Sequence, residues 1–143
     1  MKLINLTATE IIKGFANNNF SALDLAGELC KQVDKYSFLN ALINFDPEIF
    51  LKLAQRSDDV RKKGGTIGSL EGVPVVVKDN IDVIGFKTTA ANAALRRQSP
   101  SSNGPVIQAL LDAGAIVMAK SNMHELAFSP GITNNMPDQE WKY

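Results

Sequence analysis

A lysine follows the most apolar run of the chain. The residues Val73–Val77 are apolar throughout, and Lys78, Asp79 and Asn80 come directly after them. A lysine at the end of a buried strand loses part of its hydration, which disfavours the charged amine and lowers its pKa. Such an amine can act as a general base toward a serine hydroxyl. Considered alone, Lys78 fits a structural alternative better, in which it pairs with Asp79 or reaches solvent beyond the strand.

The single histidine, His124, precedes Glu125, and the two could form an acid–base pair or bind a metal ion together with Asp79. Metal motifs in proteins repeat histidine or cysteine at short spacing. The chain has one histidine and one cysteine and shows no such spacing. We therefore expect no metal site, and a histidine that begins a helix or makes a structural hydrogen bond.

Several serines lie in segments that expose side chains. Ser99, Ser101 and Ser102 belong to a polar loop, where serine is common as a turn residue, and Ser129 stands before Pro130-Gly131. None of them lies in the G-x-S-x-G turn that presents a nucleophilic serine. No local pattern marks a nucleophile.

The spacing of apolar residues predicts alternating helices and strands. Capping signals begin helices at Ala8 and Ala22, and Asp46-Pro47 begins a third helix that Gly64-Gly65 ends. Helices are predicted over 8–17, 22–36, 47–63 and 105–113, and strands over 39–45, 73–77 and 115–119. This alternation indicates an α/β fold.

Polar residues gather where two of the predicted strands end. Lys78-Asp79-Asn80 follows one strand and residues 121–125 follow the last one, and functional groups in α/β sheets collect at the carboxyl ends of strands. Both strands read as apolar throughout, which predicts cover on both faces. Neighbouring strands are expected to bury Val75, Val77, Ile116 and Val117.

Other side chains are expected to be structural. Cys30 lies on the apolar face of the second helix and is expected to be an inert core thiol. Arg61-Lys62-Lys63 is expected to be a solvated helix end rather than a phosphate contact. Apolar helix stripes are predicted to bury Ile49, Phe50, Leu53, Ala54, Val60, Val106, Ile107, Leu110 and Leu111.

The composition indicates a globular chain of one domain. The 143 residues are 45% hydrophobic and 21% charged, and fifteen Lys and Arg balance fifteen Asp and Glu. Because the chain has no surplus of basic residues, we expect it to bind neither nucleic acid nor a membrane surface. The glycines between Gly64 and Gly72 lack the spacing of a phosphate-binding loop. No signal peptide is recognisable and the one cysteine excludes an internal disulfide, so a cytoplasmic location is expected.

Three segments together resemble the amidase signature family. Residues 72–80, GVPVVVKDN, match its G-x-P-x-x-x-K-D-N block, and Thr88-Thr89-Ala90 resembles the T-T-A element that follows. Residues 112–117 and 120–128 are similar to its AGAI and GK-T/S-N-M-x-E-x-A stretches. The resemblance extends over about residues 1–135, and the order of these segments makes it specific.

The resemblance implies a serine amidase on a large mixed β-sheet flanked by helices, working without metal or organic cofactor. Lys78 matches the lysine of the family's Ser-Ser-Lys triad, which passes protons through a second serine to the nucleophilic serine. The fold class expected here is therefore α/β, with residues 1–143 forming the N-terminal portion of that domain.

The chain departs from the family where the triad serines are expected. No Gly/Ser-rich segment of the G-G-S-S-G-G-S type is present, and MPDQEWKY after Asn134-Asn135 does not resemble the family's continuation. Ser129 stands where the family carries glycine and is not expected to replace the nucleophile. We therefore expect an N-terminal fragment that is inactive alone.

The complete parent is expected to hydrolyse a carboxamide to acid and ammonia. The block NMHELAF favours small-amide hydrolases over the tRNA amidotransferase A subunits of the same family, in which an acidic residue is expected at His124. The alternative is a non-catalytic binding domain, or one half of a split amidase that binds a complementing C-terminal chain. A strand edge and an apolar face left open by the missing sheet predict self-association or low stability.

Overall fold

Side-chain caps begin the first two long helices at the predicted residues. The computed structural model describes residues 2–64, 67–97 and 99–128. Thr7 and Glu10 form a capping box at helix α1 (Ala8–Ala16), and Ser21 and Asp24 form another at α2 (Ala22–Lys35). These reciprocal bonds satisfy amide groups that have no partner inside the helix.

The remaining elements follow the predicted order. Asp46 accepts bonds from the amides of Glu48 and Ile49 and, with Pro47 in the first turn, begins α3. The later elements are β1 (Leu42–Phe45), α3 (Pro47–Lys62), β2 (Pro74–Lys78), α4 (Pro105–Asp112) and β3 (Ile116–Ser121). Short 3₁₀ turns are η1 (Leu3–Asn5), η2 (Ser37–Leu39), η3 (Ala93–Leu95) and η4 (Glu125–Ala127).

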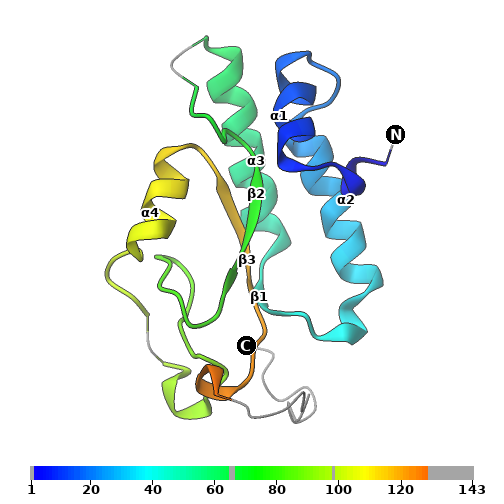
Figure 1. Ribbon diagram of the computed structural model, residues 1–143. Coiled ribbons are helices and arrows are strands. Elements are labelled where there is room, and N and C mark those ends of the chain that lie inside the picture. The colour runs from blue at the N-terminus through cyan, green and yellow to red at the C-terminus, as the bar shows by residue number, and fades with distance from the viewer. Residues whose placement is uncertain (1, 65–66, 98, 129–143) are drawn as a thin grey trace.

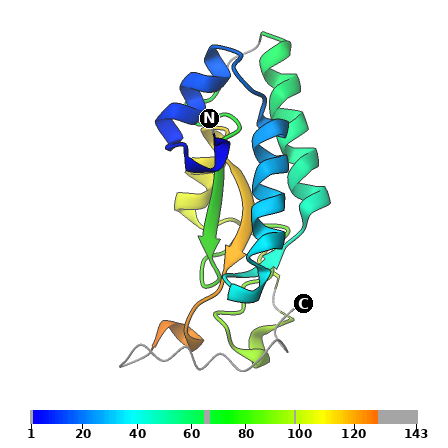
Figure 2. The ribbon, with the colours of Figure 1, turned by 90° about the vertical axis from the view of Figure 1, so that its right-hand side faces the viewer.

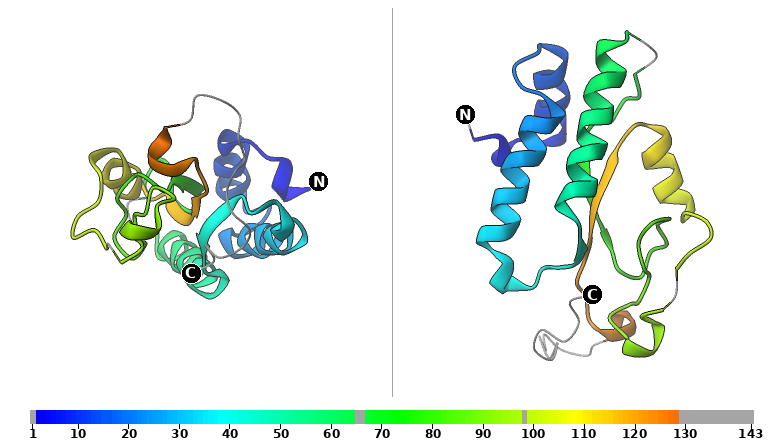
Figure 3. Two further views of the ribbon diagram at one scale, coloured as in Figure 1. Left: turned by 90° about the horizontal axis from the view of Figure 1, so that it is seen from below. Right: turned by 180° about the vertical axis from the view of Figure 1, so that it is seen from behind.

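The strands form a mixed sheet with β3 in the middle. Within the described ranges the sheet has three strands in the order β1-β3-β2, and β3 runs antiparallel to β1 and parallel to β2. Helices α1, α2 and α3 lie on one side of this sheet and α4 on the other (Figures 1 and 3). The α/β class is confirmed.

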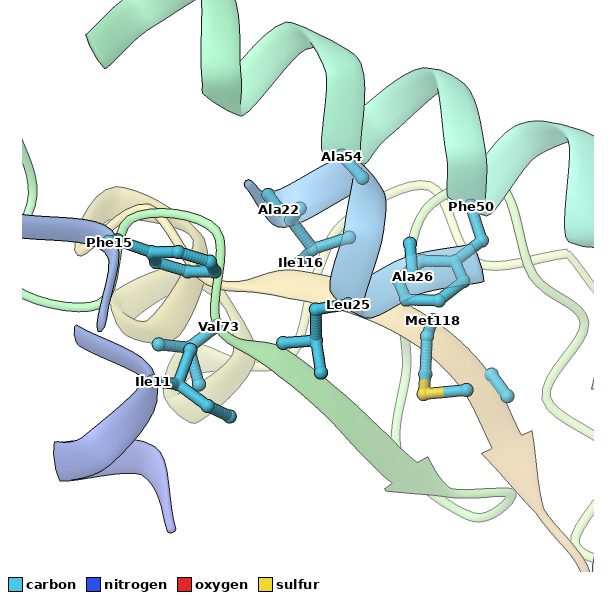
Figure 4. Close-up of a cluster of buried hydrophobic side chains, with 11 residues drawn as sticks. Ile11, Phe15, Ala22, Leu25, Ala26, Phe50, Ala54, Val73, Ile116 and Met118 are labelled. Carbon is cyan, nitrogen blue, oxygen red and sulfur yellow. The ribbon is translucent and has the colours of Figure 1, made fainter. Parts of the chain in front are cut away.

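The larger of two apolar cores fills the side of the sheet that faces α1, α2 and α3. Figure 4 shows side chains from these helices meeting those of Val73 and β3. Its buried members are Ile11, Phe15, Ala22, Leu25, Ala26, Phe50, Ala54, Val73, Ile116, Met118 and Ala119. Cys30 packs against this core, and burial raises the pKa of its thiol, as expected for an inert cysteine.

The smaller core lies between the sheet and α4. Val77 of β2, Val117 of β3, Ile107 of α4 and Val83 of the following loop are its buried members. Val77, Ile116 and Val117 are thus buried as predicted, while Val75 is only partly buried. Adjacent strand residues serve opposite cores because side chains alternate between the faces of a sheet.

A buried carboxylate joins α2 to α3. Asp58 accepts bonds from the amides of Ala22 at 2.9 Å and Leu23 at 3.0 Å, and it pairs with Arg61. The Arg61 guanidinium also lies 4.1 Å from the centre of the Phe15 ring. The prediction of a solvated basic triplet therefore holds for Lys62 and Lys63, which are exposed, and is wrong for Arg61.

Some predicted boundaries and burials are wrong. β1 begins later than predicted because Asn40 adopts a left-handed conformation, with φ of +48°, after η2. The prediction that β2 is covered on both faces is wrong at Val76, which is 47% exposed. Ile49 and Val106 lie in the first turns of α3 and α4 and are 50% and 71% exposed, so their predicted burial is wrong as well.

The glycine-rich segment before β2 serves packing. A Cβ atom added to Gly68 would lie 2.2 Å from the carbonyl oxygen of Ala113, so only glycine fits there. The amide of Leu70 donates to the same carbonyl at 2.8 Å.

Across the part of the chain that the structure describes, no helix combines the length and the apolar character needed to cross a membrane.

The two faces of β2 give a stability prediction. We expect Val77→Asp to unfold the chain, because it buries a charge without a partner, at a cost of several kcal/mol or more (about 2–7 even for a neutral polar group). Val76→Asp on the exposed face is the matched control and should melt within about 0.5 kcal/mol of the original chain. Thermal unfolding followed by circular dichroism measures both. A cooperatively melting Val77→Asp variant would contradict the assignment of this core.

Candidate functional site

The parallel pairing of β2 and β3 brings the two predicted polar segments together. Lys78 at the end of β2 is in register with Ser121 at the end of β3. The arrows of β2 and β3 point the same way in Figure 2, and the loops that follow them lie beyond the same end of the sheet. The segments containing Lys78 and residues 121–125 thus meet at one end of the sheet, as predicted.

The Lys78 side chain lines a polar pocket at this end of the sheet. Its Nζ donates to the carbonyl oxygen of Asn122 at 3.3 Å. The pocket has a volume of about 510 Å³ and is called the Lys78 pocket below; it is lined by Leu39, Asn40, Ala41, Lys78, Ser121, Asn122, Met123 and His124. Lys78 is exposed. The prediction that a lysine at this strand end loses part of its hydration is therefore wrong for the described residues.

Asp79 lies in a buried network and does not form an ion pair with Lys78. Its carboxylate is 1% exposed and accepts a bond from the Thr89 hydroxyl, another from the Thr89 amide at 3.2 Å and a third from the Ala91 amide at 3.3 Å. Ala90 and Ala91 adopt left-handed conformations, with φ of +47° and +55°. Such backbone is disfavoured for alanine, so the bonds to Asp79 hold this turn in place.

The ion-pair partner of Asp79 is Lys120, which was not among the predicted site residues. Lys120 is 0% exposed, and its Nζ lies 3.6 Å from Asp79 Oδ1. It also donates to the carbonyl oxygens of Ile81 at 2.7 Å and Lys87 at 3.3 Å. Burial lowers the pKa of Lys120, and the Asp79 carboxylate opposes this shift. The signal in the sequence was its position, since Lys120 ends the second apolar run as Lys78 ends the first.

His124 and Asp79 do not meet. His124 precedes η4 and lines the Lys78 pocket, whereas Asp79 is buried with Lys120 and Thr89. Glu125 accepts a bond from the Asn92 side-chain amide at 2.6 Å. Neither the acid–base pair nor a metal site with Asp79 is formed, and the described residues contain no group of three or more His, Cys, Asp or Glu side chains suited to a metal ion.

The candidate serines do not surround Lys78. Ser99, Ser101 and Ser102 are exposed in the loop before α4, and Ser129 lies outside the described residues. Ser121 lies beside Lys78 in the sheet register and lines its pocket. Within the described segments, the Lys78 amine donates to the backbone carbonyl of Asn122 rather than to a serine hydroxyl.

A buried hydroxyl without a partner lies close to this network in sequence. Within the ranges that the structure describes, Thr88 Oγ1 is the buried side-chain polar atom that has no hydrogen-bond partner. Unpaired buried polar groups are rare in complete protein interiors.

Comparison with known sequences identifies one family. The family model described as Amidase matches residues 24–139 of this chain. The chain is 42% identical over 126 residues to mandelamide hydrolase of Pseudomonas putida, with 88% of this chain and 25% of the relative covered. It is 34% identical over 134 residues to the A subunit of the mitochondrial glutamyl-tRNA(Gln) amidotransferase of Canis lupus familiaris, covering 94% of this chain and 26% of that protein.

Solved structures give the same result. The peptide amidase of Stenotrophomonas maltophilia matches with a TM-score of 0.78 at 26% identity, over 85% of this chain and 25% of the amidase. A further structure, described as an amidase, matches with a TM-score of 0.80 at 29% identity, over 86% of this chain and 28% of that chain. The chain spans about a quarter of the length of these relatives.

The buried ion pair gives a second stability prediction. Lys120→Met leaves the Asp79 carboxylate buried without its counter-charge, and we expect the free energy of unfolding to fall by about 3–5 kcal/mol. Adding Asp79→Asn removes that charge, so the double variant should be more stable than Lys120→Met alone. Urea unfolding measures both differences.

The matched control is Lys52→Met, which changes an exposed lysine of α3 and should alter stability by no more than about 0.5 kcal/mol. Strictly additive losses for Lys120→Met and Asp79→Asn would show that the two charges do not interact.

Proposed function

Because this chain belongs to the amidase family, we propose that it supplies the lysine base of a serine amidase that hydrolyses a carboxamide to acid and ammonia. The observation that supports this proposal best is the placement of Lys78, which carries the family's K-D-N lysine at a strand end that opens into a pocket. Residues 1–143 would form part of one amidase domain.

Lys78 would act by taking a proton from a serine hydroxyl. Its Nζ donates to a backbone carbonyl, that of Asn122, and the ion pairs found among the described residues do not include it. An amine acts as a base only when it has lost its own proton, and a nearby carboxylate would hold that proton in place. In the proposed site the neutral amine accepts the serine proton, directly or through a second serine, while the serine oxygen attacks the amide carbonyl. The protonated amine would return that proton to the leaving nitrogen as the C–N bond breaks and ammonia departs. Water would then hydrolyse the acyl-enzyme to the acid and restore the serine.

The nucleophile would come from residues other than these 143. The chain has no Gly/Ser-rich segment like that of the family, and amide hydrolysis through an acyl-enzyme needs a nucleophile and oxyanion donors as well as a base. The serines would lie in further sequence of the same polypeptide or in a complementing chain. We therefore expect these 143 residues to be inactive alone.

The exposed side of β2 is where complementing polypeptide would add. β2 is an edge strand within the described part of the chain, and Val76, Ile81 and Ile84 are exposed on it or just after it. An open strand edge beside apolar side chains favours strand addition. Without a complementing chain, the same edge would favour self-association.

The substrate would be a small carboxamide. The 42% identity to mandelamide hydrolase supports this choice, and His124 in the Lys78 pocket replaces the acidic residue expected in tRNA amidotransferase A subunits. The alternative function is a non-catalytic domain that binds a partner without turnover. No cofactor is included in the proposal, since a serine, a second serine and a lysine suffice for the chemistry.

Ammonia release tests the proposal. The 143-residue chain is mixed with the part of Pseudomonas putida mandelamide hydrolase that it does not match, and mandelamide is supplied. We expect ammonia release in the mixture but from neither piece alone, and Lys78→Ala should lower the rate by about 10²–10⁴-fold, the usual contribution of a general base. Lys52→Ala is the control.

Two results would contradict the proposal. A complex that forms and releases no ammonia would favour the non-catalytic alternative. Stoichiometric labelling of a serine in the isolated chain by a fluorophosphonate, with turnover lost in Lys78→Ala, would show that these residues already contain a nucleophile.

A further inference from the structure

Two lysines end neighbouring strands and point to opposite faces of the sheet. Lys78 lines its polar pocket and is exposed, while Lys120, paired in the register with Val77, is fully buried. The side chain of Val77 belongs to the core beneath α4, and side chains alternate along a strand. The sheet thus separates one accessible amine from one enclosed amine.

The acceptors of the Lys120 ammonium all come from one loop, residues 79–91, called the Asp79 loop below. An ammonium group has three N–H donors. The Lys120 amine has the carbonyl oxygens of Ile81 at 2.7 Å and Lys87 at 3.3 Å, and the carboxylate of Asp79 at 3.6 Å. Because a buried ammonium without acceptors is strongly disfavoured, these three groups must stay around it. The ammonium therefore fixes the fold of the loop.

The Asp79 loop does not line the Lys78 pocket, but it is bonded to the segment that follows His124. The Asp79 carbonyl accepts a bond from the Ala90 amide at 3.2 Å, and the Ala90 carbonyl accepts one from the Leu126 amide at 2.8 Å. Asn92, just after the loop, donates to Glu125 at 2.6 Å. The segment that carries His124 into the pocket is thus held by the loop that Lys120 orders.

The same loop sets the direction of Lys78. The Asp79 amide donates to the Ser121 carbonyl at 3.2 Å, and the Ile81 amide donates to the Lys78 carbonyl at 3.1 Å. The backbone on the C-terminal side of Lys78 is therefore fixed by β3 and by the loop. Its exposed side chain adds one hydrogen bond, to Asn122.

We propose that Lys120 is a positioning residue for Lys78: it holds Asp79 and the loop on the α4 side of the sheet, so that the Lys78 amine enters its pocket from the opposite face without a carboxylate partner. The catalytic consequence rests on the proposed function, because Lys78 is a base only if the chain serves an amidase. The positioning itself is a property of this chain alone.

The charges around the two lysines support this division. Asp79 and Asp82 are the carboxylates that act on the Lys120 charge. On the other face, His124 is the titratable side chain that lines the pocket with Lys78. If Lys120 lost its charge, Asp79 would be left as a buried carboxylate next in sequence to Lys78.

Nuclear magnetic resonance of the complete 143-residue chain tests the proposal. The variants are Asp79→Asn, Lys120→Met and the control Lys52→Met, each measured at a temperature where it is fully folded. In the original chain we expect nuclear Overhauser contacts between the Lys78 ε-methylene and Asn122, and slow exchange of the Thr89 and Ala91 amides. Asp79→Asn and Lys120→Met should lose the Lys78 contacts. Amide protection should fall about tenfold or more, because Asp79→Asn replaces a charged acceptor by a weaker neutral one and Lys120→Met removes the cation that holds the Asp79 carboxylate. Lys52→Met should change neither.

A folded Asp79→Asn variant that keeps the Lys78 contacts would overturn the proposal, since a purely stabilising ion pair would lower the melting temperature without moving Lys78. If Lys120→Met does not fold, Asp79→Asn still decides, because its amide oxygen remains an acceptor for Thr89 and Ala91. The test needs no substrate. Its failure is therefore distinct from a failure of the ammonia assay, which bears on the proposed function.

Discussion

The enclosed ammonium of Lys120 is the constraint that organises the strand-end region. Removing this charge from water is costly, and among the described residues the Asp79 carboxylate, two backbone carbonyls and the charge of Asp82 compensate for it. These groups lie along the Asp79 loop, which must wrap around the amine and take up left-handed backbone at Ala90 and Ala91. A buried ion pair of this kind adds little net stability compared with apolar packing, and its main effect is to select one loop conformation.

The layout of the sheet explains why the two lysines differ. β3 is central and its last residues are enclosed from both sides, so Lys120 is buried. β2 has a neighbour on one side among the described residues, and its exposed edge leaves Lys78 open to solvent.

Local signals in the sequence predicted most of the fold. The capping boxes at Thr7 and Ser21 and the Asp46-Pro47 start act within a few residues, so the helix starts were correct. The burial of Val76, Ile49 and Val106 was predicted wrongly because burial depends on which elements lie across the sheet, and an apolar run does not contain that information. The Arg61–Asp58 pair and its contact with α2 were not predicted, because an apolar or charged run does not show which helix lies beside it.

The candidate site was predicted only in part. The family resemblance and the strand-end rule both identified Lys78, and the register confirms that its segment meets residues 121–125. Its environment was not predicted, since the desolvated lysine is Lys120. That residue was overlooked because its partners, Asp79, Ile81 and Lys87, are distant in sequence and no local motif links them.

The central claim, that a charged Lys120 ammonium is enclosed by the Asp79 loop, is tested most directly by the side-chain nitrogen resonance of that lysine at neutral pH. We expect a protonated Nζ whose hydrogens exchange with water far more slowly than those of the exposed Lys52. An Nζ of Lys120 that is neutral, or that exchanges as fast as Lys52, would contradict the account.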